Sequence, residues 1–233
     1  MNSQIRHEEN QDAWSSFAAW LKECLPELNA DDLKVPVELL YEELVAFNTH
    51  TNVTRITDFG DFLSKHIADS ILGLKAFPDL LSKPLTVIDI GCGGGFPGLP
   101  LALLCKASTF TEVDSVAKKL TFVDHAVQKL SLTHMTTCHG RARELGRLSD
   151  HQKHYELILA RAVAESGDLI KECRQLLCSD GMMLLYKTPA AVVQEAKVTE
   201  REAKKAGLII RQSEIWQLPD GSERQFIMAG RFS

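Results

Sequence analysis

The segment from Val87 to Gly98, VIDIGCGGGFPG, has the residue types best suited to binding a ligand. Its five glycines within eight residues allow positive φ angles and a close approach by a ligand, because glycine has no Cβ. A helix beginning after this loop would also offer free backbone N–H groups. Since so many glycines cost conformational entropy on folding, the segment predicts a ligand-binding loop. A tight turn without a ligand is the alternative.

Two ligands compete for this loop. Gly93, Gly95 and Gly98 match the G-x-G-x-x-G pattern of dinucleotide-binding folds, which would make the chain an NAD-dependent oxidoreductase. That pattern should begin where the strand ends, and the β-branched run ends at Gly91. From there the spacing is Gly91-x-Gly93-x-Gly95, and Asp89 inside the strand suits a cationic ligand better than a pyrophosphate. S-adenosylmethionine, with a sulfonium and an ammonium group and no phosphate, is therefore favoured over NAD.

Further polar groups follow the next three predicted strands. Asp114 lies about 20 residues after the glycines, where a ribose-binding carboxylate is expected; a helix cap is its alternative role. The backbone of residues 139–144 would meet an adenine edge. Arg161 follows the fourth strand, and ligands bind at the carboxyl ends of strands in open parallel sheets. A surface ion pair with Glu165 or Asp168 is the alternative for Arg161.

The segments that must position these groups alternate between strands and helices after Pro84. Strands are predicted at 85–90, 109–113, 135–138, 156–160, 182–186, 208–217 and 225–229, and helices at 98–105, 117–130, 167–177 and 190–206. Such alternation predicts a parallel sheet with helices on both faces. Only a turn separates the last two strands, so they must form an antiparallel hairpin.

Residues 1–82 are predicted to contain helices only, and Pro36 would open the second of them at a favoured first-turn position. The expected fold is thus α/β, a doubly wound, Rossmann-like sheet of seven strands of the class I methyltransferase type. It would have a C-terminal antiparallel hairpin and an N-terminal helical extension. The boundaries are 1–82 for the extension and 83–233 for the S-adenosylmethionine-binding domain, and the two would form one structural unit.

The composition of the chain excludes several classes of protein. It has 233 residues, 45% of them hydrophobic and 24% charged, which is typical of a soluble globular protein. No apolar run approaches the ~20 residues of a membrane-spanning helix, and no signal peptide is recognisable, so we expect a cytoplasmic location without membrane contact. A net charge of −5 argues against coating nucleic acid by bulk charge but allows a local basic patch.

No metal site is expected from the six cysteines, which should be reduced thiols. Cys138, His139, Cys173 and Cys178 have the wrong spacing for a zinc knuckle.

Several motifs of this chain match one known family. The matching stretches are Asn48-x-x-x-Asn52-Val-Thr54, His66-x-x-Asp69-Ser70, Asp89-Ile-Gly-x-Gly-x-Gly-Phe-Pro-Gly-x-Pro100, Asp114-Ser-x-x-Lys118-Lys119, His139-Gly-Arg-Ala142, Arg161-Ala-Val-Ala164, Lys187 and Glu223-Arg224. In these the chain resembles the bacterial 16S ribosomal RNA guanine-N7 methyltransferases, also called glucose-inhibited division protein B. The stretches extend from about residue 37 to residue 230, and the glycine loop and the Arg161 stretch are specific in combination.

The resemblance implies methylation of N7 of the guanine at position 527 of 16S rRNA, with S-adenosylmethionine as methyl donor. It implies cofactor contacts from Gly91, Phe96, the Ala142-Arg143 backbone and Arg161. Asp89, Gly93, Gly95 and Asp114 complete the cofactor residues expected from the motif. The chain departs from the family pattern at Phe47, Val53, Arg143 and Thr188, and the Arg143 change reverses a charge beside the adenosine pocket.

The residues agree with chemistry on a ring nitrogen. Guanine N7 has a free lone pair and needs no general base, and no nucleophile or base follows the fourth strand. Arg161 is the expected catalytic residue, holding guanine O6, a phosphate or the cofactor carboxylate, because N7 must stay open. Arg141, Lys187 and Arg224, with Arg143, would form a basic patch for the RNA backbone.

Some alternatives stay open. His66 and Asp69 lie one helical turn apart and would form a hydrogen-bonded pair that fixes the extension to the sheet. The polar loop 48–55 would close over the cofactor. Besides the oxidoreductase, a methyltransferase with a non-RNA substrate and a non-catalytic RNA-binding module remain rivals. The substrate would be 16S rRNA within a small-subunit particle, although naked RNA is not excluded.

Overall fold

The computed structural model describes residues 3–51 and 53–232, and the side chains from residue 9 onward within these ranges. Asn52 of the first motif therefore lies outside the described residues. The strands are β1 Thr86–Ile90, β2 Thr109–Asp114, β3 Met135–His139, β4 Tyr155–Arg161, β5 Leu177–Lys187, β6 Ile209–Gln212, β7 Trp216–Gln217 and β8 Glu223–Gly230. The helices are α1 Ser3–Cys24, α2 Ala30–Asn48, α3 Phe59–Phe62, the π-helical segment η1 Leu63–Ala68, α4 Asp69–Ile71, α5 Gly73–Ala76, α6 Asp79–Ser82, α7 Gly98–Leu104, α8 Ala117–Lys129, α9 Ala142–Leu145, α10 Ser166–Cys173 and α11 Pro189–Ala206.

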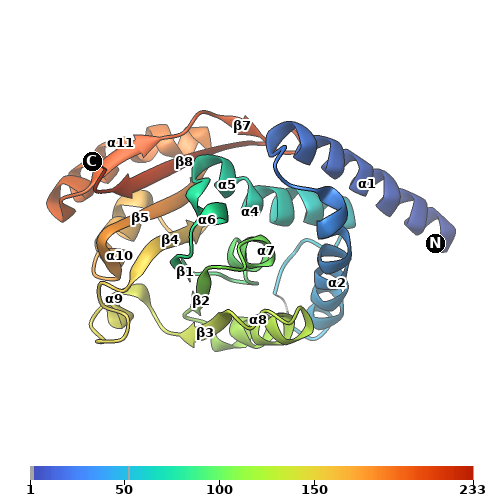
Figure 1. The fold of residues 1–233 in the computed structure, drawn as a ribbon, viewed down its shortest axis with the longest axis horizontal. Coiled ribbons are helices and arrows are strands. Elements are labelled where there is room, and N and C mark those ends of the chain that lie inside the picture. Colours follow the sequence, from blue (N-terminus) through green and yellow to red (C-terminus); the bar gives the residue numbers. More distant parts are fainter. Residues whose placement is uncertain (1–2, 52, 233) are drawn as a thin grey trace.

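The strands form one sheet in the order β3-β2-β1-β4-β5-β8-β6, with the two-residue β7 paired to β8 beside it (Figure 1). β1 to β5 run parallel, and β8 enters antiparallel between β5 and β6. The doubly wound sheet and its antiparallel C-terminal hairpin are thereby confirmed. The chain reverses its strand order beside β1, so the carboxyl ends of β1, β2 and β4 meet at the crevice where such sheets bind ligands.

Side chains along the central strands alternate between two hydrophobic layers, as the twofold period of a strand requires. Val87 and Leu157 belong to the cluster that contains the N-terminal helices, whereas Ile88 and Ile158 belong to the cluster with α10 and α11. The first cluster runs without interruption from the N-terminal helices to the sheet. Arg161 lies four residues after Leu157 in β4, and every second residue of a strand faces the same side, so its side chain points to the N-terminal helices.

The prediction for the second helix is wrong at its start. α2 begins at Ala30, where the Asn29 side chain accepts a hydrogen bond from the Asp31 N–H as an N-cap, and Pro36 lies inside the helix. Pro36 lacks an N–H, which leaves the carbonyl of Asp32 without its intrahelical partner. Asp32 is exposed, so water can satisfy that carbonyl.

Two strand predictions differ from the structure. The segment 208–217 is not one strand, because residues 213–215 interrupt it and leave the short β7 as an eighth strand. β5 begins at Leu177, five residues earlier than predicted, through pairing of Leu177 with Tyr155 across a register shift. In the described part of the chain, no helix is both long and apolar enough to cross a membrane.

Candidate active site

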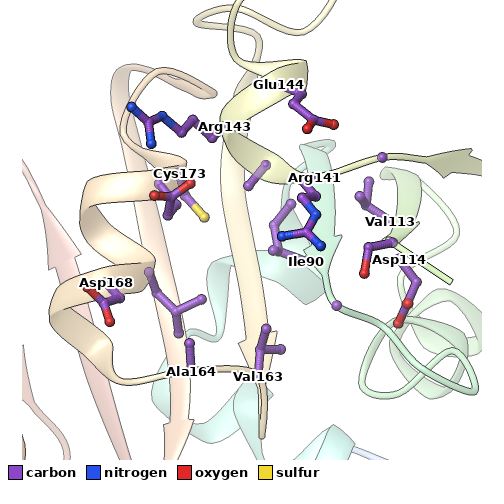
Figure 2. Close-up of a pocket in the computed structure, with 16 residues that line it drawn as sticks. Ile90, Val113, Asp114, Arg141, Arg143, Glu144, Val163, Ala164, Asp168 and Cys173 are labelled. Atoms are coloured by element: carbon purple, nitrogen blue, oxygen red, sulfur yellow. The ribbon is translucent and has the colours of Figure 1, made fainter.

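A cavity of about 540 Å³ lies at the carboxyl ends of β1 to β4 (Figure 2). Its volume is in the range of small-molecule sites. It is lined by Ile90, Gly91, Val113, Asp114, Ser115, Gly140, Arg141, Ala142, Arg143, Glu144, Val163, Ala164, Asp168, Leu169, Glu172 and Cys173. Four of the predicted cofactor residues, Gly91, Asp114, Ala142 and Arg143, therefore come together here, although they are spread over 53 positions of the chain.

The glycine loop forms one wall of this cavity because its backbone takes conformations that other residues avoid. Gly91, Gly93 and Gly95 have φ angles of 69°, 61° and 82°. A Cβ on Gly91 would lie 2.6 Å from a methyl group of Val163, so the glycine is also needed for the loop to pack against the segment after β4. A Cβ on Gly93 would meet no atom within 4 Å, so the loop is open at that point.

Asp114 is held rigidly at the end of β2. Its Oδ2 accepts a hydrogen bond from the Gly93 N–H at 3.0 Å, and its Oδ1 accepts one from the Val116 N–H at 2.8 Å. Only 7% of its side chain is exposed, and Lys119 Nζ lies 3.7 Å from Oδ2. The carboxylate thus stabilises a local turn and also lines the cavity.

The charges around the cavity favour a cation. Its lining contains four carboxylates, from Asp114, Glu144, Asp168 and Glu172, and two guanidinium groups, from Arg141 and Arg143. A pyrophosphate would meet this excess of negative charge unfavourably, whereas a sulfonium and an ammonium group would be attracted. The residues present therefore fit S-adenosylmethionine better than a dinucleotide.

Three other predicted cofactor residues lie beneath or beside the loop. Asp89 is 1% exposed, and its Oδ2 accepts a hydrogen bond from the Gly98 N–H at 3.0 Å. Phe96 is 4% exposed and stacks on the imidazole of His66, with ring centroids 4.2 Å apart. Asp89, Gly93, Gly95, Phe96 and Arg161 do not line the cavity, so a direct cofactor contact from each stays a prediction.

A second hollow of about 420 Å³ lies on the other side of the segment that follows β4. It is lined by Lys65, Asp69, Arg161, Ala162, Tyr186, Lys187, Thr188, Ala191 and Arg224. Ala162 has a φ of 55°, a left-handed conformation that is uncommon outside glycine. Because of this turn, Ala162 borders the second hollow while Val163 borders the first. The two hollows are thus divided at the step from Ala162 to Val163.

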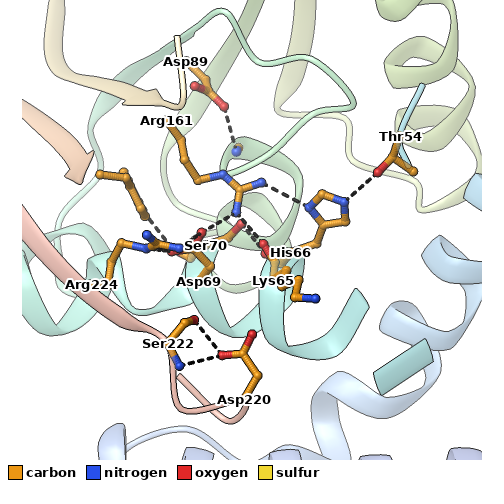
Figure 3. A network of polar contacts seen from close by, with 12 residues as sticks. Thr54, Lys65, His66, Asp69, Ser70, Asp89, Arg161, Asp220, Ser222 and Arg224 are labelled. Atoms are coloured by element: carbon orange, nitrogen blue, oxygen red, sulfur yellow. Dashed lines mark hydrogen bonds and ion pairs between the residues drawn. The ribbon is translucent and has the colours of Figure 1, made fainter. Parts of the chain in front are cut away.

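Arg161 is bound into a polar network with the N-terminal helices (Figure 3). Its guanidinium donates to the Lys65 carbonyl and to Asp69 Oδ2, both at 2.9 Å, and to His66 Nδ1 at 3.2 Å. The predicted position at the end of β4 is correct, but the ion-pair partner is neither Glu165 nor Asp168. It is Asp69, 92 residues away along the chain.

Asp69 binds a second arginine at the same time. Arg224 of β8 donates from Nε to Oδ1 at 2.6 Å and from Nη2 to Oδ2 at 3.0 Å, the bidentate geometry of a strong arginine–carboxylate pair. We call Asp69, Arg161 and Arg224 the carboxylate clasp. It joins α4, β4 and β8, and the Tyr186 hydroxyl strengthens this junction by donating to the Ser70 carbonyl at 2.8 Å.

His66 supports the clasp as a neutral ring. Burial and the nearby Arg161 charge lower its pKa from 6.5 to about 3. Since Nδ1 accepts from Arg161, the proton lies on Nε2, which then donates to Thr54 Oγ1 at 3.1 Å. His66 and Asp69 were expected to bond to each other; instead each bonds Arg161, and through it they connect the extension to the sheet.

The basic residues predicted for RNA lie in different settings. Lys187 is 10% exposed and bonds the Ala164 carbonyl and Glu195, and Arg224 is held in the clasp. Arg141 and Arg143 line the first cavity (Figure 2), whereas Lys187 and Arg224 line the second hollow. Their contacts with RNA stay predictions. Among the described residues, no cluster of three or more His, Cys, Asp or Glu side chains is arranged to hold a metal ion.

The fold and the acidic cavity define a class I S-adenosylmethionine-dependent methyltransferase. Solved structures with this fold include a SAM dependent methyltransferase from Aquifex aeolicus, with a TM-score of 0.50 and 17% identity over 68% of this chain and 92% of that one. Another is TYW2 from M. jannaschii in complex with AdoMet, with a TM-score of 0.53 and 13% identity over 70% of this chain and 74% of that one. The chain belongs to the GidB family, rRNA small subunit methyltransferase G, whose model matches residues 35–223.

Curated relatives agree with this family. The chain is 33% identical to ribosomal RNA small subunit methyltransferase G of Lactobacillus helveticus over 85% of this chain and 82% of the relative. It is 32% identical to the protein of the same name from Lactobacillus acidophilus, over 84% of this chain and 89% of that protein. Identity to the Lactobacillus johnsonii relative is 40%, over 65% of this chain and 63% of that protein. The resemblance noted in the sequence is thereby confirmed, and an oxidoreductase is not favoured.

Proposed function

We propose that this chain transfers a methyl group from S-adenosylmethionine to N7 of a guanine in small-subunit ribosomal RNA, the guanine at position 527 of 16S rRNA. The observation that carries the proposal is the arrangement of two hollows of opposite charge on either side of residues 161–163. One suits a cationic methyl donor, and the other suits a nucleotide. To act on small-subunit ribosomal RNA, the protein would work in the cytoplasm.

The first cavity would take the cofactor. The carboxylate of Asp114 would accept hydrogen bonds from the ribose hydroxyls, because its position is fixed by two backbone N–H groups. The backbone at Ala142 and Arg143 would border the adenine. If only the backbone of Arg143 contacts adenine, the reversed charge of its side chain leaves this contact unchanged.

The second hollow would take the RNA. Its lining contains four cationic side chains, from Lys65, Arg161, Lys187 and Arg224, and one carboxylate, from Asp69. The excess of positive charge attracts phosphate groups and the carbonyl O6 of guanine. Arg161 lines this hollow and directly precedes the turn at Ala162, after which Val163 lines the cavity proposed for the cofactor.

The chemistry needs orientation rather than proton transfer. When bound, S-adenosylmethionine supplies a methyl group on a sulfonium sulfur, and the N7 lone pair bonds to that methyl as the carbon–sulfur bond breaks. Arg161 holds the guanine or its phosphate while leaving N7 open, and the clasp fixes the guanidinium in place. His66 takes no proton at neutral pH because its pKa is lowered to about 3.

The proposal is tested by methyl transfer to small ribosomal subunits from cells that lack this protein, followed by mapping of methylguanosine by mass. Arg161→Ala should lower the rate by roughly 100-fold, the size of loss seen when a preorganised donor is removed. The fold should persist because Asp69 keeps Arg224. Arg201→Ala, at a side chain that is 62% exposed on α11, is the matched control and should keep the wild-type rate.

Binding measured by calorimetry tests the cofactor separately. S-adenosylhomocysteine should bind and NADH should not. Wild-type protein that binds NADH, or that methylates no site on the subunit, would refute the proposal. Near-normal turnover by Arg161→Ala would remove Arg161 from the mechanism. Naked 16S rRNA run in parallel shows whether the particle is required.

A further inference from the structure

Two carboxyl groups lie side by side beneath the glycine loop. Asp89 of β1 and Glu112 of β2 are directly paired in the parallel register of the two strands, and both side chains point to the face that carries α7. Neighbouring strands are about 4.8 Å apart, so the two side chains are in contact range. Asp89 is 1% exposed and Glu112 is fully buried.

The hydrogen bonds available to this pair do not satisfy two ionised groups. Asp89 Oδ2 accepts from the Gly98 N–H, a contact drawn in Figure 3. The other three oxygens, Asp89 Oδ1 and both of Glu112, are buried without any hydrogen-bond partner in the described structure. Two ionised carboxylates at this distance, out of contact with water, would repel each other strongly. A proton between them removes both difficulties, because it supplies a donor and cancels one charge.

We propose that Asp89 and Glu112 share one proton at neutral pH and that this pair is a positioning device for the glycine loop. Glu112 carries the proton and donates to Asp89 Oδ1. Asp89 is the ionised partner, because the Gly98 N–H stabilises a negative charge on it. The Asp89 carboxylate in turn holds Gly98 at the end of the loop.

The pair acts on the loop at a point where space is very limited. A Cβ on Gly98 would lie 1.7 Å from Glu112 Oε1, so the backbone of Gly98 rests directly on the Glu112 carboxyl group. Asp114 holds the loop at Gly93, and Asp89 holds it at Gly98. If the loop binds the cofactor, as the proposed function requires, the protonated pair keeps it in the binding conformation.

The electrostatic surroundings agree with this state. Burial raises the pKa of both carboxyl groups, and the neighbouring Asp89 charge adds to the rise at Glu112, whose pKa lies well above its usual range, whereas the Gly98 N–H opposes the rise at Asp89. Other charged or titratable groups facing the pair are Asp114 of β2, Cys92 in the loop, Arg161 of β4 and Tyr186 of β5. Arg161 has the opposite effect on Asp89, because its positive charge lowers that pKa.

The sign of the resulting pH dependence follows from proton counting. The folded chain keeps a proton that the unfolded chain has released above about pH 4.5, so stability falls as the pH rises. Because the folded protein keeps this proton, its melting temperature should fall between about pH 6.5 and pH 8.5. The fall should be roughly 5–10 °C larger than that of a protein without the pair. Glu112→Gln supplies a permanent N–H donor in place of the shared proton, so this variant should lack that fall.

The experiment compares the melting temperatures of wild type, Glu112→Gln and Glu200→Gln across this pH range. Glu200 is an exposed glutamate of α11 and serves as the matched control, which should follow the wild type. S-adenosylhomocysteine affinity should stay constant for wild type in the same buffers, where the pair keeps its proton, and should weaken only at a higher pH at which the folded pair loses it; for Glu112→Gln it should stay constant throughout. Parallel pH curves for wild type and Glu112→Gln would overturn the proposal.

Infrared spectroscopy of the wild type covers the case in which Glu112→Gln does not fold. A protonated carboxyl C=O band should be present at neutral pH and should disappear as the pH rises towards the unfolding limit; a spectrum without that band overturns the proposal. If S-adenosylhomocysteine does not bind at any pH, the proposed function fails, while the melting curves and the infrared band still decide whether the pair shares a proton.

Discussion

Asp69→Asn removes the negative charge of the carboxylate clasp while keeping the shape of the side chain. The carboxylate is 5% exposed, and the guanidinium groups of Arg161 and Arg224 have side chains that are 12% and 18% exposed. Breaking a buried ion pair by removing one partner costs ~3–5 kcal/mol, because the remaining charge is left without compensation. Both arginines keep some contact with water, so the lower value of about 3 kcal/mol is the better expectation. For a chain of this size that corresponds to a fall in melting temperature of roughly 6–12 °C.

The same substitution should impair methyl transfer more than cofactor binding. Arg161 would keep the Lys65 carbonyl and His66 but lose its charged partner, and a small displacement of a positioning group lowers a rate by roughly 10-fold or more. Asp69 does not line the cavity assigned to the cofactor, so S-adenosylhomocysteine affinity should change little.

Urea unfolding and the methyl-transfer assay check both expectations. Asp79→Asn is the matched control, since it breaks an exposed i,i+4 pair with Lys83 whose side chains are 49% and 59% exposed. That pair contributes only about 0.3–0.5 kcal/mol. The reasoning about the clasp is refuted if Asp69→Asn and Asp79→Asn have the same free energy of unfolding.

Two further substitutions test other parts of the site. Gly98→Ala would place a Cβ 1.7 Å from Glu112 Oε1, so it should destabilise the fold by about 1–3 kcal/mol and weaken S-adenosylhomocysteine binding, both measurable by urea unfolding and calorimetry. Wild-type values for both quantities would contradict the close packing of Gly98. Because the pKa of His66 falls from 6.5 to about 3 on folding, the unfolded chain binds the extra proton and stability is lost as the pH drops below 6.5. Between about pH 6.5 and pH 4.5, the free energy of unfolding of His66→Gln should therefore fall by about 2 kcal/mol less than that of wild type. Equal falls would show that His66 is not buried in its neutral form.

The sequence was sufficient to locate the ligand-binding edge of the sheet. The glycine loop, Asp114 and Arg161 each follow a strand, and parallel strands end at one edge, so their meeting needs only the strand pattern. The start of α2 was missed because Pro36 is equally compatible with a first turn and with an exposed position inside a helix. Residues 213–215 interrupt the predicted strand, and the hydrophobic pattern of the sequence does not report where backbone pairing stops.

The partners of the site residues were harder to predict than their positions. Arg161 has acidic neighbours in sequence, at Glu165 and Asp168, yet the turn at Ala162 and the parity of β4 send its side chain to the opposite layer. Its partner Asp69 lies in a separate helical segment, and no local pattern relates the two. The pairing of Glu112 with Asp89 was not predicted, because Asp114 is the better placed of the two acids at the end of β2; an acid inside an apolar strand was the signal that could have found it.

The buried carboxyl groups are compensated in two different ways, by guanidinium groups around Asp69 and by a shared proton between Asp89 and Glu112. Asp69 faces two guanidinium groups, so its negative charge is compensated and it can bind both strongly. Glu112 faces another carboxyl group and no cationic side chain, so a proton compensates its charge at the lowest free-energy cost. Asp69 therefore fixes the arginine that we propose for the substrate, and the Asp89–Glu112 pair fixes the loop beside the cavity that we propose for the methyl donor. Because Arg161 also faces Asp89, a change in the protonation of the pair would alter the electrostatic field at both hollows together.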